Sequence, residues 1–234
     1  MELVVPRCRS LTDLFSQAAS SDLEVLADLI TDNGKGRVAL DSGVKAIILK
    51  RREKGDLKSI PDVLEAEIRA FGGNSWANLG RPEGVDYKEV VIDVAKKLDG
   101  KPFANDDIFA LENIVITKAI DKYAPDGVKA MAAGGVALSD LLGHIVQGLV
   151  AASGVVTGVV ASAGVTGVAE VIGTRVATVL FPPLALAGVG LAAFQAAGPA
   201  FRITIPAVLQ VAKIRRTRFD ADFSAYTEGL RACL

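Results

Sequence analysis

The stretch AASGVVTGVVASAGVTGVAEVIGTRVATVLFPPLALAGVGLAAF, residues 151–194, decides the fold class, because it contains only two charged residues, Glu170 and Arg175. It is rich in Gly, Ala, Val and Thr and comparatively poor in the Leu, Ile and Phe that fill ordinary cores. The charge-free runs that surround these two residues, 141–169 and 176–201, each exceed the roughly 20 residues that a helix needs to cross a bilayer. The stretch therefore indicates either a membrane hairpin or the buried centre of a soluble helical protein.

The energetics of this stretch make membrane insertion marginal. Glu170 and Arg175 each oppose insertion by roughly 2.5–3.5 kcal/mol if they lie near the bilayer centre, and the small residues contribute little in its favour. A segment with a balance near zero can be sheltered in a soluble fold and released from it. Conditional insertion is the leading interpretation, and a buried helical hairpin in a soluble protein is the alternative.

The spacing of small residues indicates close helix packing in either environment. Gly154 and Gly158 form a GxxxG pair, and Gly164 and Gly167 follow three residues apart. Such spacing lets helix backbones approach closely, in a bilayer or in a tight soluble bundle. The pair formed by Pro182 and Pro183 disfavours a continuous helix, so we expect two long helices that turn at this point.

The remainder of the chain predicts an all-α protein with little or no sheet. Apolar residues recur with helical spacing between Gly- and Asn-rich breaks, and no segment alternates convincingly with a period of two. Helix starts are predicted by a capping box of Ser21 with Glu24, by Ser59 before Pro61, and by Asn105. We expect three parts: a helical N-terminal module (1–127), a Gly/Ala-rich apolar hairpin (128–201) and an amphipathic C-terminal helix with a basic exit (202–234).

The basic exit follows the apolar region directly. Its four cations are Lys213, Arg215, Arg216 and Arg218. Under the positive-inside rule they would keep this end of the chain on the cytoplasmic side of a membrane. An equally good explanation is a solvated helix end whose cations are favoured by the helix dipole.

No catalytic, cofactor-binding or metal-binding pattern is present in the sequence. His144 is the only histidine, and Asp140 lies on the same helical face four residues earlier. A partly buried His–Asp hydrogen bond explains this pair better than a catalytic dyad, and no cysteine or histidine cluster suggests zinc. The net charge of −1 does not favour nucleic acid. The two cysteines, Cys8 and Cys233, are expected as free thiols in a reducing compartment.

Three blocks of the chain resemble the YaaW family, a group of bacterial proteins of uncharacterised function. The blocks are LADLITDNGKGR (26–37), EIRAFGGNSWANLGRPEGVDYKEVVIDVAKKL (67–98) and AFRITIPAVLQVAKIRR (200–216). The family has been grouped distantly with ubiquinol–cytochrome c chaperones, which implies a helical fold and a partner-binding role. The resemblance implies a shared structural or interaction feature at Phe71, Gly72, Gly73, Asn74, Asn78, Arg81, Arg202, Pro206 and Gln210.

The residues themselves suggest how these positions act. Gly72 and Gly73 would permit a turn with positive φ, and Arg202 could pair with an acidic residue of the N-terminal module. Trp76, an aromatic residue in a Gly- and Asn-rich loop, is expected to plug a core, with a recognition role as the alternative.

These observations predict a non-enzymatic protein whose N-terminal module shelters an apolar hairpin that inserts into, or self-associates at, a lipid bilayer. Such a protein would be a membrane-perturbing effector or stress protein. The alternative is a soluble, chaperone-like module that binds a protein partner through the same apolar surface. The start of the chain shows no secretory signal, so the expected location is the cytoplasm, with the inner face of the cytoplasmic membrane as the place of association.

Overall fold

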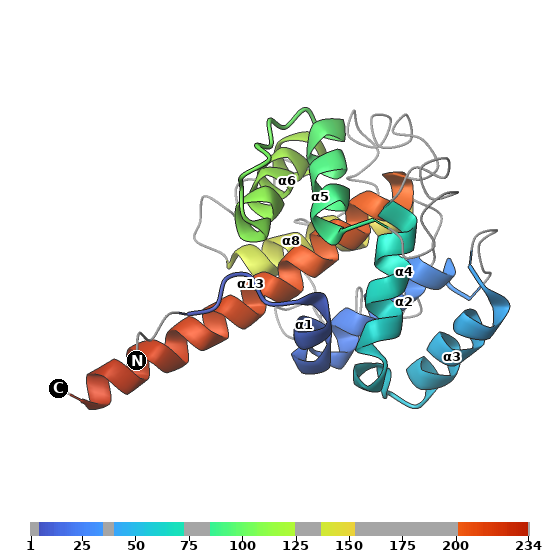
Figure 1. Cartoon of the computed structure of the whole chain (residues 1–234), viewed down its shortest axis with the longest axis horizontal. Coiled ribbons are helices and arrows are strands. Elements are labelled where there is room, and N and C mark those ends of the chain that lie inside the picture. Colours follow the sequence, from blue (N-terminus) through green and yellow to red (C-terminus); the bar gives the residue numbers. More distant parts are fainter. Residues whose placement is uncertain (1–4, 35–39, 73–84, 125–136, 153–200, 234) are drawn as a thin grey trace, which may run out of the picture.

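A computed structural model shows a protein built from helices arranged around one long C-terminal helix (Figure 1). It describes residues 5–34, 40–72, 85–124, 137–152 and 201–233. Within these ranges the chain forms eight α-helices and one 3-10 helix and contains no strand, which confirms the all-α expectation. The predicted hairpin lies mostly outside these ranges, because residues 153–200 are not described.

The N-terminal module begins with five helical elements that pack closely together. The elements are α1 (Leu11–Gln17), α2 (Ser20–Thr31), α3 (Ser42–Glu53), the 3-10 helix η1 (Leu57–Ser59) and α4 (Pro61–Gly72). Helix α2 ends where Asp32, Asn33 and Gly34 adopt φ angles of 50°, 51° and 79°. Because left-handed residues cannot continue an α-helix, this turn ends α2 at the first of the Gly- and Asn-rich breaks.

The predicted start of α2 is wrong. The helix begins at Ser20, and Ala19 occupies the N-cap position without a side-chain hydrogen bond, so Ser21 and Glu24 do not form a capping box. The backbone at Ala18 and Ala19 is extended between α1 and α2. The first turn of α2 is instead fixed from outside, because the side chain and main-chain carbonyl of Asp22 hold residues of the C-terminal helix.

Two further predicted caps are also wrong. The Ser59 hydroxyl donates to the carbonyl oxygen of Asp56 at 2.7 Å within the η1 turn, and α4 begins only at Pro61. The helix after residue 105 is capped by Asp107, whose Oδ1 accepts from the N–H of Ala110 at 2.7 Å. In each case a nearby aspartate or turn competes successfully for the backbone donors that the sequence assigned elsewhere.

Helices α5 (Tyr87–Lys97) and α6 (Ile108–Tyr123) run side by side in the same direction. The Tyr87 hydroxyl at the start of α5 contacts Glu112 in the first half of α6, at 3.1 Å. At the opposite end, Lys122 of α6 forms an ion pair with Asp99 at 3.2 Å. The connection between the two helices must therefore return along α5, and it places both helix C-termini at one end of the molecule.

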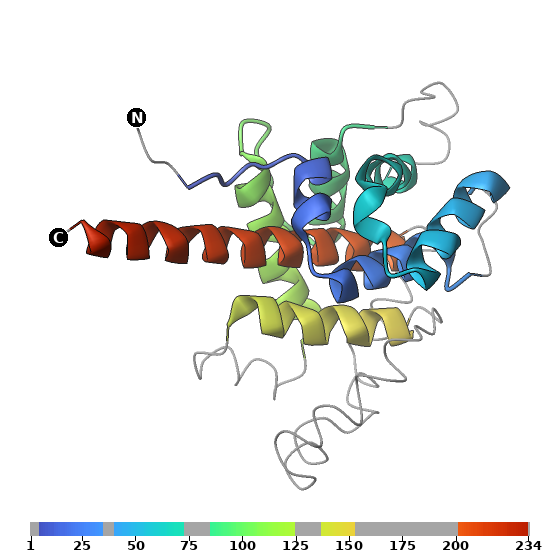
Figure 2. The same ribbon diagram turned by 90° about the horizontal axis from the view of Figure 1, so that it is seen from below.

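The last two described helices, α8 (Leu138–Ala152) and α13 (Phe201–Ala232), form an antiparallel pair (Figure 2). Gly143 near the start of α8 faces Lys213 in the middle of α13: a Cβ atom at this glycine would lie 3.6 Å from the lysine side chain. This register brings the end of α8 beside the start of α13. The described chain thus stops before residue 153 and resumes at residue 201 at the same end of the body.

Helix α13 is the centre of the fold rather than an appendage. Its first half contributes buried residues continuously from Thr204 to Ala212 and again at Ile214 and Arg215. It packs against α1, α2, α4, α5, α6 and α8. Its second half projects beyond the other helices in both views (Figures 1 and 2), and Phe223 and Leu230 are about half exposed there, at 53% and 47%.

Candidate functional site

Most of the residues that the sequence analysis singled out lie outside the described ranges. These are Gly73, Asn74, Trp76, Asn78, Arg81, Gly154, Gly158, Gly164, Gly167, Glu170, Arg175, Pro182 and Pro183. Phe71 and Gly72 are the last two residues of α4, so the helix continues through the glycine that the sequence assigned to a turn. The remaining three, Arg202, Pro206 and Gln210, all lie in the first half of α13.

Gln210 joins the centre of α13 to the start of α2. Its side-chain amide is buried and donates to both the carbonyl oxygen and the Oδ1 atom of Asp22, each at 3.0 Å. Lys213, one turn later, donates to the same carboxylate oxygen at 2.7 Å. These contacts connect residues that are almost 190 positions apart, and they hold α13 in register against the N-terminal module.

A second polar cluster crosses the interior where α5, α6 and α13 meet. The Arg215 guanidinium donates through Nε to Glu112 at 2.8 Å and through Nη1 to the carbonyl oxygen of Arg9 at 2.5 Å. Arg215 is 3% exposed and Glu112 is 1% exposed. The Tyr87 hydroxyl donates to the other carboxylate oxygen of Glu112, Oε1. One buried carboxylate therefore connects three helices. Its arginine partner also binds the N-terminal arm, which is the stretch of residues 5–10 before α1.

The electrostatics of this cluster follow from its burial. Burial raises the pKa of the Glu112 carboxyl, and the positive charge of Arg215 opposes this effect. Burial also raises the pKa of the Tyr87 phenol well above its ordinary value, and the neighbouring Glu112 charge reinforces the increase. The Glu112 carboxyl and the Tyr87 phenol therefore act as hydrogen-bonding partners that stabilise the packing of α5, α6 and α13. Because both are buried, they provide no exposed reactive atom.

The other cations of the predicted basic exit are engaged as well. The Arg216 guanidinium lies 3.5 Å from the centroid of the Phe109 ring, and its Nη2 donates to Asn113 at 2.6 Å. Arg218 pairs with Asp222 at 2.6 Å. This cluster lies in the middle of a 32-residue helix, so its interpretation as a solvated helix end is wrong.

The N-terminal arm is attached to the same part of α13. The Arg9 side chain forms ion pairs with Asp222 at 2.7 Å and with Asp13 at 2.8 Å. The side-chain hydrogen bonds to these two carboxylates raise the pKa of Arg9. The arm thus strengthens the attachment of the projecting half of α13.

A third buried carboxylate, Asp28, connects α2 to α3. The Arg52 Nη2 atom lies 2.7 Å from Oδ1 of Asp28 and donates to Oδ2 at 2.9 Å. The Asp28 side chain is fully buried, and burial raises its pKa to about 6, against the opposing charge of Arg52. Desolvation therefore outweighs the attraction of the ion pair, as is common for buried pairs.

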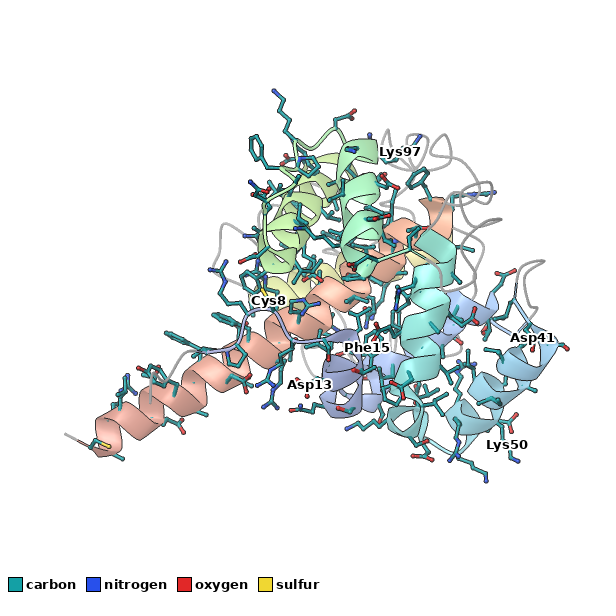
Figure 3. The ribbon with its side chains drawn as sticks, in the orientation of Figure 1. Cys8, Asp13, Phe15, Asp41, Lys50 and Lys97 are labelled. Carbon is teal, nitrogen blue, oxygen red and sulfur yellow. The ribbon has the colours of Figure 1, made fainter. Side chains whose placement is uncertain are left out.

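Cations without ion pairs lie at the end of the molecule where the described chain stops before residue 153 and resumes at residue 201. The Lys97 ammonium group at the end of α5 lies 5.3 Å from the centroid of the Phe201 ring, the first residue of α13. Figure 3 shows Lys97 beside this start of the helix. Arg202 follows in the first turn and is half-buried, and none of the ion pairs within the described residues involves it. The expected pairing of Arg202 with an acidic residue of the N-terminal module is therefore not found there.

His144 lies on α8 near Lys213 and is half-buried. Burial lowers its pKa, the neighbouring Asp140 charge opposes this change, and Lys213 reinforces it. Both cysteines, Cys8 and Cys233, are free and exposed, as predicted. No helix in the described ranges combines the length and the apolar character that crossing a membrane requires.

Comparison with curated proteins supports the resemblance suggested by the three sequence blocks. The UPF0174 protein YaaW of Escherichia coli strain K12 is 25% identical over 228 residues, which cover 87% of this chain and 92% of that protein. The resemblance to the YaaW-like proteins is confirmed. A UPF0174 protein of Helicobacter pylori strain J99 is 24% identical over 226 residues, covering 87% of this chain and 89% of its own length. A second UPF0174 protein of that strain is 28% identical over 188 residues, which cover 69% of this chain and 90% of that protein.

Each of the three YaaW-like blocks contributes to the buried polar contacts. Asp28 lies in the first block, Tyr87 in the second and both Gln210 and Arg215 in the third. No family model matches the chain, and no solved structure matches it. The distant grouping with ubiquinol–cytochrome c chaperones stays a prediction.

Asp22 and Glu112 were not predicted as site residues, although Glu112 has a recognisable signal in the sequence. Glu112 shares the spacing of the apolar positions Val115, Ile116 and Ala119, all of which are buried on α6. An acidic residue within such a stripe needs a buried cation as its partner. The sequence alone does not show which of the four cations of the basic exit provides it.

Proposed function

We propose that the protein associates with membranes, and that its helical body presents residues 153–200 to a lipid bilayer. The single observation that carries this proposal is the antiparallel arrangement of α8 and α13. Because both ends of the segment attach at one end of the body, the segment can enter a bilayer only by crossing it an even number of times. A hairpin that turns at Pro182 and Pro183 satisfies this requirement.

The length and composition of the segment agree with one such hairpin. A turn at Pro182 and Pro183 leaves arms of 29 residues (153–181) and 17 residues (184–200), and a single helical crossing needs about 17–25. Glu170 and Arg175 are the only charged residues between positions 153 and 200, and they keep the insertion balance marginal. The proposed function is therefore reversible or triggered insertion, with self-association in the membrane stabilised by the glycine spacing.

The test replaces residues 153–200 with a linker of six Gly and Ser residues. Adjacent helices lie about 8–10 Å apart, and such a linker spans roughly 13 Å on average, so α8 and α13 can keep their pairing. Purified full-length protein should float with liposomes in a density gradient and release an entrapped dye. The linker variant should keep its helical circular dichroism and do neither.

A second pair of variants tests the role of close packing. Gly158→Leu should reduce dye release at least tenfold, because the added side chain separates helices that a GxxxG pair brings together. Val159→Leu, at the neighbouring position, is the matched control and should leave dye release within about twofold of the original. Full-length protein that remains soluble, leaves liposomes intact and captures one protein partner would overturn the proposal and favour the chaperone-like alternative.

A further inference from the structure

The end of the body at which residues 153–200 attach has a concentration of cations without acidic partners. Lys96 and Lys97 are the last residues of α5, and both are exposed. Arg202 is in the first turn of α13, next to the Phe201 ring that Lys97 contacts. None of the ion pairs in the ranges that the structure covers involves any of these three cations. This distinguishes them from the cations in the middle of α13, which are engaged by Asp22, Glu112 and Asp222.

The nearby acidic residues do not form ion pairs with this group. Asp93 lies one turn before Lys97 on α5, and none of the ion pairs within the described residues involves it. Asp99 follows α5 directly, but its carboxylate is paired with Lys122 at 3.2 Å. The net charge of the whole chain is −1, so any attraction to a negatively charged surface must arise from a local concentration of this kind.

The position of these cations fits the headgroup layer of a membrane. If residues 153–200 enter the bilayer, the ends of α8 and α13 lie at the membrane surface. Lys and Arg near the cytoplasmic surface are attracted by anionic lipids, and an apolar ring such as that of Phe201 can occupy the boundary between headgroups and acyl chains. The contact between the Lys97 ammonium and the Phe201 ring joins both features in one place.

We infer that this end of the protein binds anionic phospholipid headgroups, with Lys96, Lys97 and Arg202 as the contacting residues. The inference rests on the proposed membrane association and specifies its partner. The charge complementarity is that of three unpaired cations and a negatively charged leaflet. Each cation should contribute about fivefold to the apparent binding constant at low salt.

The experiment compares vesicles of pure phosphatidylcholine with vesicles that contain 30% phosphatidylglycerol. Binding of the full-length protein is measured by co-sedimentation at low and high salt. The original protein should bind the anionic vesicles at least tenfold more tightly, and added salt should reduce this preference. The triple variant Lys96→Gln, Lys97→Gln, Arg202→Gln should lose most of the preference.

A matched control removes the same charge from another surface. Lys50→Gln, Lys54→Gln and Lys58→Gln change three exposed lysines on and after α3, which lies away from Lys97 (Figure 3). This variant should retain the preference for anionic vesicles. A charge-preserving variant, Lys96→Arg, Lys97→Arg, Arg202→Lys, should also retain it, which separates loss of charge from any disturbance of the fold.

The outcomes distinguish this inference from the proposed function. Equal binding of the original protein to both kinds of vesicle would overturn the lipid preference and leave membrane association standing. A control variant that loses as much preference as the triple variant would overturn the assignment to this end of the molecule. Absence of binding to either kind of vesicle would overturn both.

Discussion

At the scale of single residues, the interior of this protein depends on buried charges that have few substitutes. Glu112 is the common partner of Arg215 and Tyr87, and both of its oxygens are engaged. Removal of one member of a buried pair leaves the other charge without compensation, whereas removal of both can be nearly neutral. The pair is therefore better tested by a double substitution than by a single one.

Arg215→Met should destabilise the fold by about 3–5 kcal/mol, because Glu112 would remain buried without its cation. The free energy of unfolding is measured by urea denaturation. The double variant Arg215→Met, Glu112→Leu should recover most of this loss. Equal destabilisation in the single and double variants would show that the ion pair does not account for the effect.

Asp28 should make stability depend on pH in the direction opposite to that of a typical surface carboxylate. Its pKa of about 6 in the folded protein is above its ordinary value of 3.8, so the folded state binds the proton more tightly. The resulting stabilisation is complete below about pH 4 and is lost as the pH rises through 6. A shift of about two units corresponds to roughly 3 kcal/mol.

Asp28→Asn should remove this loss and stabilise the protein by about 1–3 kcal/mol at pH 7.5, with little change at pH 4. Thermal unfolding at both pH values provides the measurement. Asp56→Asn is the control, because Asp56 pairs with Arg51 at the surface, and it should change stability much less than Asp28→Asn does. Destabilisation of the Asp28→Asn variant at pH 7.5 would show that the attraction of Arg52 outweighs the burial cost.

At the scale of helices, two glycines that look alike in the sequence have opposite surroundings. Gly143 lies within α8, and a Cβ atom there would make an ordinary contact of 3.6 Å with the Lys213 side chain. Gly100 follows α5, and a Cβ atom there would lie 2.8 Å from the carbonyl oxygen of Ala95. Only the second position requires the absence of a side chain.

Gly143→Ala should therefore stabilise the protein by about 0.5–1 kcal/mol, which is the difference in helix propensity between the two residues. Gly100→Ala should destabilise it, because the backbone of α5 must move to admit the new atom. Comparison of the two melting temperatures checks both expectations. A lower melting temperature for Gly143→Ala would mean that the antiparallel register of α8 and α13 is incorrect.

Helix positions could be predicted well from the sequence, and helix caps could not. Apolar residues with helical spacing between Gly- and Asn-rich breaks indicated a helical chain, and the structure has helices in these parts of the sequence. The cap predictions failed because several Ser, Asp and Asn residues compete near each helix start. Tertiary contacts, such as those of Asp22 with Gln210, decide between them.

At the scale of the whole molecule, the central place of α13 was not predictable from its sequence. The segment from 202 onward combines apolar residues with four closely spaced cations, a pattern that is also typical of an exposed helix end. The cations of this segment can pack against the body only because Asp22, Glu112 and Asn113, from distant parts of the chain, accept their hydrogen bonds. Gln210 was singled out by resemblance, but its partner could not be identified without the fold.

Truncations of α13 should separate its structural half from its projecting half. A chain that ends after Phe223 should keep its fold and lose less than about 1 kcal/mol, because the residues beyond it are largely exposed. A chain that ends after Ala212 lacks Lys213 and Arg215 and should not fold cooperatively. Circular dichroism during heating measures both. A folded protein after the shorter truncation would contradict the central role of this helix.

The placement of α13 after the apolar segment has a consequence for biosynthesis. A ribosome releases the chain from its N-terminus, so residues 153–200 leave the ribosome before the helix that completes the core does. During that interval the other helices lack the partners that α13 supplies to Asp22 and Glu112. The most apolar segment of the nascent chain is therefore outside the ribosome while the rest of the protein cannot yet complete its fold.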